Sequence, residues 1–182
     1  SVDIEGSSDL IEIDEDKIFV TSSLYEIEVQ DYTETTFFTF DKNGQLLGSV
    51  NFEEKPWFMK KQNQKIILGI GRPRCGILTI DDKYNISHSR TDGNSPVNMG
   101  IKTNKRFLLG HSDGTITEIN DSGRKYIQCG NDSITAISSK DISWQAGDKN
   151  GNLFSSDGWS KKLGDRINCI VETKHHIWVS VT

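Results

Sequence analysis

Short runs rich in Ile, Val, Phe, Leu and Thr recur along the whole chain, with glycine or aspartate between them. Examples are KIFVTSS, TFFTF, KIILGI, GILTI and TITEI. The runs are too short for helices, and the sequences DKNG, SDG and NDSG between them favour tight hairpins, because Asn-Gly and Asp-Gly tolerate the positive φ that such turns need. No window repeats apolar residues at helical spacing between capping residues, so the pattern predicts an all-β protein.

One stretch of this pattern occurs twice. ITAISSKDISWQAG, which begins at Ile134, is echoed by INCIVETKHHIWVSV, which begins at Ile167. A further copy begins at Val97, and a looser one at about Trp57. The period of 33 to 37 residues indicates stacked supersecondary units. Each full copy divides into four short strands, which in the copy at Ile134 are 134–138, 143–147, 152–155 and 159–163.

Repeated four-stranded antiparallel sheets around an axis are the layout of a β-propeller, whose sheets are called blades. Residues 1–6 alternate like a strand and would complete the shortened last blade, which gives five blades. The alternative is that the chain is part of a six- to eight-bladed propeller. The sequence thus predicts one domain, 1–182, with repeats at about 8–54, 55–95, 96–132, 133–165 and 166–182.

The segments NDSITAI, GNLF and DRINCIVETKHHIWVSV resemble β-propeller repeats, notably those of the two-component-regulator type and the broader WD-repeat-like superfamily. The resemblance covers the chain in outline and is specific from about Val97 onward. No repeat ends in the Trp-Asp dipeptide of the strict WD family. In such a propeller Phe107, Trp144 and Trp178 would lie on the second strand of successive blades and pack one blade against the next.

Composition and charge narrow the possible functions. With 182 residues, 34% of them apolar and 16 of them glycine, the chain is typical of a folded, turn-rich, soluble protein. The net charge of -5 and the isoelectric point of about 5.4 argue against a nucleic-acid partner. No apolar run reaches the roughly 18 residues of a membrane span, so membrane insertion is not expected. These features leave the oligomeric state open.

Three widely spaced cysteines, Cys75, Cys129 and Cys169, indicate neither a disulfide framework nor a zinc site. Reduced, mostly buried thiols and a cytoplasmic location are expected, with an extracellular location as the alternative. The adjacent His175 and His176 have no third ligand that the sequence can nominate, so no metal and no cofactor are expected. Because no nucleophile elbow, phosphate-binding glycine loop or cysteine-histidine signature is present, the chain is not expected to be an enzyme.

One insertion carries the candidate binding residues. GIGRPRCG, from Gly69, lengthens a predicted hairpin and places Arg72 and Arg74 around a proline. By the propeller resemblance, this hairpin shares a binding face with His111 and Asp113 of another turn. The arginines are suited to a carboxylate or phosphate of a partner, and the alternative is that they pair with neighbouring acidic residues.

The leading hypothesis is a non-catalytic propeller that serves as a protein-interaction module or scaffold through Arg72, Arg74, His111 and Asp113. The alternative is a ligand-sensing or carbohydrate-binding propeller, in which aromatic residues such as Trp57 and Trp159 are exposed for stacking. An enzyme on a propeller scaffold ranks last, because no convergent catalytic set is visible.

Overall fold

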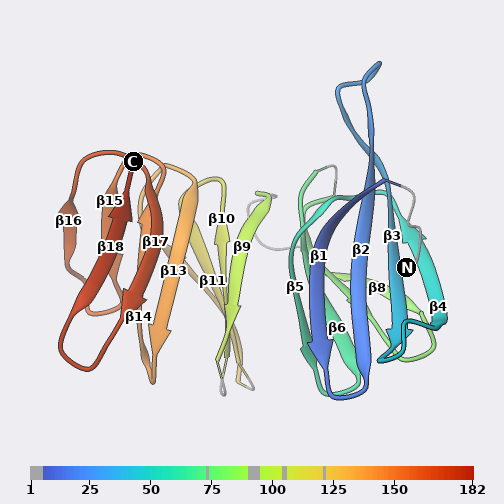
Figure 1. The fold of residues 1–182 in the computed structure, drawn as a ribbon. Coiled ribbons are helices and arrows are strands. Elements are labelled where there is room, and N and C mark those ends of the chain that lie inside the picture. Colours follow the sequence, from blue (N-terminus) through green and yellow to red (C-terminus); the bar gives the residue numbers. More distant parts are fainter. Residues whose placement is uncertain (1–5, 73, 90–94, 104–105, 121) are drawn as a thin grey trace. The chain divides into compact units, whose positions relative to one another are not determined.

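The computed structural model describes residues 6–72, 74–89, 95–103, 106–120 and 122–182, and none of these residues lies in a helix (Figure 1). Accordingly, within these ranges no helix has the length and hydropathy needed to cross a membrane. The chain divides into two compact units, unit 1 up to Pro96 and unit 2 from Val97. The strand predicted to complete the last blade spans residues 1–6, of which 1–5 lie outside the described ranges.

Unit 1 contains two four-stranded antiparallel sheets in which each strand pairs with the next one along the chain. The first sheet comprises β1 (Ser7–Asp14), β2 (Lys17–Glu26), β3 (Asp31–Asp41) and β4 (Leu46–Phe52). The second comprises β5 (Pro56–Gln62), β6 (Lys65–Ile70), β7 (Gly76–Ile80) and β8 (Ile86–Ser89).

Unit 2 contains two further four-stranded sheets of the same order and one pair of strands. The first sheet comprises β9 (Val97–Lys102), β10 (Arg106–His111), β11 (Thr115–Asn120) and β12 (Gly123–Gln128). The second comprises β13 (Ile134–Lys140), β14 (Ser143–Asp148), β15 (Asn152–Ser155) and β16 (Ser160–Lys162). The pair comprises β17 (Ile167–Glu172) and β18 (Ile177–Val181).

The core of each unit lies between sheets that are stacked face to face. In unit 1 the apolar faces of the two sheets meet, and the rings of Phe19 and Phe37 stack with centroids 6.0 Å apart. In unit 2, Leu108 and Ile116 of one sheet meet Trp144 of the next. The alternation of apolar and polar residues therefore produces the predicted sheets with one face turned toward a neighbour.

The repeated isoleucines are contacts between successive sheets of unit 2. Ile134 and Ile167 are fully buried, and each lies against a glycine on the second strand of the preceding sheet. The glycines are Gly110 and Gly147, where any side chain would collide with the isoleucine. The repetition in the sequence thus reflects one packing contact that is used twice.

One expectation about this packing is wrong. Phe107 and Trp144 are buried as predicted, but Trp178 is 63% exposed. In the last two strands Val179 pairs with Ile170, as Ala146 pairs with Ile137 one sheet earlier. The counterpart of Trp144 is therefore Ile177, and Trp178, one residue later, points to the opposite face.

Candidate interaction surface

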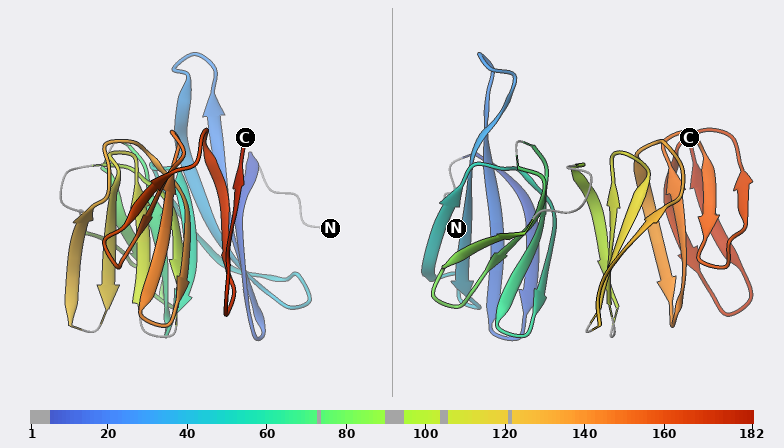
Figure 2. Two further views of the ribbon diagram at one scale, coloured as in Figure 1. Left: turned by 90° about the vertical axis from the view of Figure 1, so that its left-hand side faces the viewer. Right: turned by 180° about the vertical axis from the view of Figure 1, so that it is seen from behind.

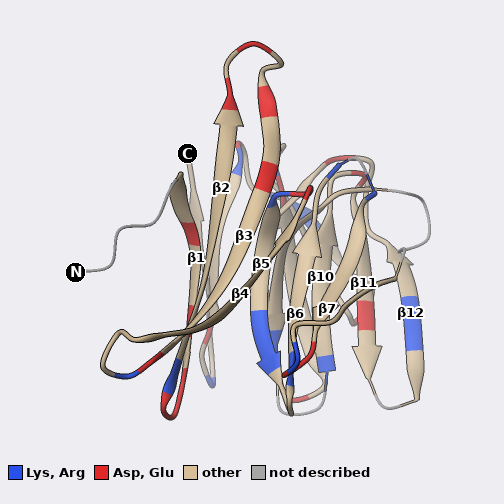
Figure 3. Ribbon diagram, turned by 90° about the vertical axis from the view of Figure 1, so that its right-hand side faces the viewer, with Lys and Arg blue, Asp and Glu red and all other residues tan. Residues whose placement is uncertain are grey.

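The hairpin of β2 and β3 extends beyond the rest of its sheet (Figure 1, Figure 2). The two strands stay paired as far as Tyr25 with Tyr32 and Glu26 with Asp31, and the positive φ of Gln30 closes the turn. Its tip carries two large aliphatic side chains, Ile27 at 82% and Val29 at 59% exposure. Acidic residues surround them, as the red segments at this hairpin show (Figure 3). The tip is therefore apolar at its centre and acidic around it.

Lys55 contacts the projecting end of this hairpin. Its Nζ lies 3.5 Å from the centroid of the Tyr32 ring and 2.8 Å from Oδ1 of Asp9, in a pair whose side chains are almost fully buried. Burial opposes the charged ammonium, but the hydrogen bonds to Asp9 and Tyr32 outweigh it and raise the pKa of Lys55. The lysine is thus a permanently charged anchor for the hairpin.

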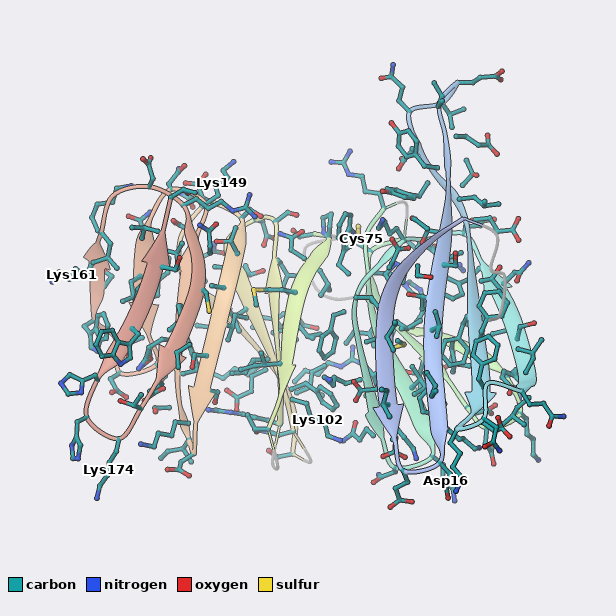
Figure 4. All side chains as sticks on the ribbon, in the orientation of Figure 1. Asp16, Cys75, Lys102, Lys149, Lys161 and Lys174 are labelled. Carbon is teal, nitrogen blue, oxygen red and sulfur yellow. The ribbon has the colours of Figure 1, made fainter. Side chains whose placement is uncertain are left out.

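The same lysine also fixes a second loop, between β6 and β7. The backbone N–H of Gly71 donates to the Lys55 carbonyl at 3.1 Å, and the N–H of Cys75 donates back to Gly71 at 2.8 Å. Nε2 of His88 lies 3.1 Å from the Cys75 carbonyl. Figure 4 shows Cys75 nearer the end of unit 1 from which the hairpin projects, whereas Asp16 lies at the opposite end.

Arg74 in this loop forms a structural ion pair. Its Nε and Nη2 donate to the two carboxylate oxygens of Glu54, with Nη2 at 2.8 Å. The Glu54 side chain is fully buried, while that of Arg74 is 43% exposed. These hydrogen bonds raise the pKa of Arg74 against the opposing effect of burial. Since a buried carboxylate needs a cation, Arg74 stabilises the loop, as the alternative interpretation of its charge predicts.

Arg72 differs from Arg74 in its surroundings. It is exposed and forms no ion pair with any described residue. Between the hairpin and the loop, the structure has an open groove of about 650 Å³. Residues of three strands, β3, β4 and β8, and of the loop line it, among them Thr33, Glu34, Phe52, Arg74, Ile86 and His88.

His111 and Asp113 lie in unit 2, in and beside the turn between β10 and β11. His111 is buried, and its Nε2 is 2.7 Å from Oγ1 of Thr117. Oδ1 of Asp113 accepts hydrogen bonds from the backbone N–H and the hydroxyl of Thr115, at 3.1 and 2.6 Å. The structure therefore brings Arg72 and Arg74 together in one loop, and His111 and Asp113 together at one turn of the other unit.

The hairpin tip is not among the binding residues that were expected from the sequence. The stretch LYEIEVQDYTE makes the first repeat longer than the others. Two signals in this stretch identify an exposed tip, namely the alternation of Ile27 and Val29 with glutamates and the length of the segment beyond a four-strand repeat. Among the described residues, no cluster of three His, Cys, Asp or Glu side chains is arranged to hold a metal ion.

No protein-family model matches this sequence, and no curated protein does. The fold, in contrast, is similar to solved structures. The β-propeller domain of Cps50 (Swd1) from Myceliophteria thermophila has a TM-score of 0.65 at 11% identity, over 98% of this chain and 64% of that one. The computationally designed Ika8 protein has the same score and identity over 98% and 70% of the two chains. The designed Ika4 protein has a TM-score of 0.60 at 11% identity, over 71% of this chain and 87% of that one.

These similarities and the repeated sheets show that the fold is a β-propeller of four-stranded antiparallel blades, which confirms the predicted fold class. At 11% identity, the likeness concerns the fold alone.

Proposed function

We propose that the protein is a non-catalytic interaction module and that a partner protein docks on the end of unit 1 formed by the β2–β3 hairpin and the Gly71–Cys75 loop. The exposure of Ile27 and Val29 at the tip of a paired hairpin carries the proposal. Burying an aliphatic side chain of this size contributes about 1.5–3 kcal/mol. Because the strands are already paired, docking orders little additional backbone.

The charges around the tip favour a particular kind of partner. Glu26, Glu28 and Asp31 are all exposed beside the aliphatic pair. A matching partner therefore has an apolar pocket with a basic rim, since complementary potentials favour association and specificity. Arg72 supplies the opposite charge and is suited to a carboxylate of the same partner.

Each of the four residues nominated from the sequence has a role in this proposal. Arg72 contacts the partner directly, and Arg74 positions the loop through Glu54. His111 and Asp113 shape the β10–β11 turn of unit 2 through Thr117 and Thr115, and a partner contact at this turn is proposed separately from the surface of unit 1. The proposal places the protein in the cytoplasm, which its three free thiols support. It includes no cofactor and no nucleic acid.

Affinity capture from an extract of the source cells, quantified by mass spectrometry, tests the proposal. Ile27→Ser with Val29→Ser is compared with Ile142→Ser, because Ile142 of unit 2 is 80% exposed and provides a matched control. Proteins retained by the wild type and by the control should decrease about tenfold or more with the hairpin variant, and should also decrease with Arg72→Glu. If every variant retained the same proteins at the same level, this surface would be excluded as the docking site.

A further inference from the structure

Unit 2 contains a second candidate site, independent of the surface on unit 1. A cavity of about 490 Å³ lies between the outer strands of the β9–β12 sheet and those of the β13–β16 sheet. We call it the interblade cleft. Its volume is within the range of roughly 300–1,000 Å³ that small-molecule sites occupy. The residues that matter for its chemistry are Arg106, Glu118, Lys125, Trp144, Phe154 and Trp159.

One wall of the interblade cleft is aromatic. Trp144 is buried and Phe154 is half-buried, whereas Trp159 is 40% exposed. The turn before Trp159 is well braced: the N–H of Ser155 donates to the Trp159 carbonyl at 3.0 Å, and the Trp144 N–H donates to Oγ of Ser156 at 3.1 Å. Trp159 is therefore an exposed aromatic surface on a fixed turn.

The opposite wall is charged and polar. Nη1 of Arg106 donates to Oε1 of Glu118 at 3.0 Å, and both side chains are largely buried. Nη2 of the arginine reaches across to the next sheet and donates to the carbonyls of Ile142 and Ser143, at 2.6 and 3.2 Å. These bonds fix the guanidinium before any ligand arrives.

Two groups on this wall remain available. Nε of Arg106 is buried, and within the described part of the chain it has no hydrogen-bond partner. A buried donor without an acceptor is costly, so an acceptor supplied by a ligand would be favoured. Lys125 pairs across the strands with Glu118, on the same face of the sheet, and is exposed without an ion pair to any described residue. Since Arg106 neutralises Glu118, Lys125 leaves the cleft with one excess positive charge.

We propose that the interblade cleft binds a saccharide with a carboxylated pyranose ring, that is, a uronic acid unit. One side of such a ring presents C–H groups that pack on the face of Trp159, while its edge presents hydroxyl groups. Glu118 accepts from a hydroxyl, Nε of Arg106 donates to an oxygen, and Lys125 pairs with the ring carboxylate.

Other ligand classes fit this cleft less well. An apolar ligand would bury Arg106 and Glu118 without new hydrogen bonds, which is unfavourable. A compact, highly charged anion would gain from Lys125 but leave the aromatic wall without a partner and meet the carboxylate of Glu118. A sugar acid uses both walls at once.

Isothermal titration of the full chain with glucuronate, galacturonate and their oligomers, beside the neutral methyl glucoside and methyl galactoside, tests the assignment. At least one uronate should bind saturably and several-fold more tightly than its neutral counterpart. Trp159→Ala should weaken that binding about tenfold or more, and Lys125→Gln should abolish the preference for the acid. Trp57→Ala is the matched control, because Trp57 is an exposed tryptophan of unit 1, and it should bind as the wild type does.

Two results would overturn the assignment. One is an absence of binding by every uronate, at concentrations up to about 10 mM, in a folded wild-type protein. The other is uronate binding that Trp159→Ala leaves unchanged. Should Trp159→Ala melt at a lower temperature than the wild type, Lys125→Gln decides instead, since its exposed side chain has no role in the described packing.

Discussion

Ile167 packs directly against the bare backbone of Gly147. A Cβ atom added to Gly147 would lie 2.4 Å from Cγ2 of Ile167, far inside van der Waals contact. Gly110 and Ile134 form the same pair one sheet earlier, where the added Cβ would lie 2.6 Å from Cγ2. The recurring isoleucine of the sequence thus fits a glycine of the preceding sheet, and this pair sets the spacing of successive sheets in unit 2.

The first prediction concerns this contact. Gly147→Ala should destabilise the protein by about 1–3 kcal/mol, because the added methyl group overpacks the space that Ile167 occupies. In an Ile167→Ala background the same substitution should cost much less, since the colliding side chain is gone. Urea denaturation of the four proteins in this cycle measures both quantities. An equal loss of stability in the two backgrounds would show that this contact does not limit the spacing of the sheets.

The second prediction separates the two arginines of the Gly71–Cys75 loop. Arg74→Met should lower the stability by about 1–3 kcal/mol, because it leaves the buried carboxylate of Glu54 without its cation. Arg72→Met, a matched change at an exposed position, should leave the stability within about 0.5 kcal/mol of the wild type. The measurement is thermal unfolding of both variants. Equal melting temperatures would contradict the assigned roles.

The third prediction concerns the stability of the protein at low pH. The side chain and backbone N–H of Asn85, and the N–H of Lys83, donate to the Asp81 carboxylate and hold its pKa below the ordinary value of 3.8. A lowered folded-state pKa means that this stabilisation is complete above about pH 3.8 and is lost as the pH falls through the folded value. The difference in melting temperature between the wild type and Asp81→Ala should therefore be constant near neutrality and shrink below about pH 3.8. A constant difference down to pH 2 or so would refute this role for the carboxylate.

The fourth prediction concerns the order in which the three cysteine thiols react. Burial raises the pKa of Cys129 to about 11 and also raises that of Cys75, whereas Cys169 is exposed. Since the thiolate is the reactive form, a thiol reagent at pH 8 or so should modify Cys169 first and Cys129 at least tenfold more slowly. Mass spectrometry of the native protein over time identifies the order. A fast phase that persists in Cys169→Ser would contradict it.

The local features of the fold were predictable because they depend on short-range rules. The alternation of apolar and polar residues predicted the strands, and Asp41 and Asp148 begin hairpin turns, as expected from the Asn-Gly sequences that follow them. The echo at Ile134 and Ile167 predicted repeated blades. Each of these signals lies within a few residues or recurs at a fixed period.

Features that depend on register or on distant partners were harder to predict. The prediction for Trp178 was wrong because the turn before it is one residue out of step with the turn before Trp144. A shift of one residue along a strand moves a side chain to the opposite face of the sheet. The pairing of Arg74 with Glu54 depends on a contact across 20 positions that the charges alone do not reveal. His111, nominated for a binding face, is buried, and its Nε2 lies 2.7 Å from Oγ1 of Thr117 on the neighbouring strand.

The central claim is that the β2–β3 hairpin of unit 1 docks into a partner protein, and site-specific photo-crosslinking tests it most directly. A photoreactive amino acid replaces Ile27 in one protein and Asp16, at the opposite end of the unit, in another (Figure 4). Irradiation in the source cells should give a discrete adduct from position 27 and none from position 16. Adducts of the same size and yield from both positions, or none from position 27, would contradict the account.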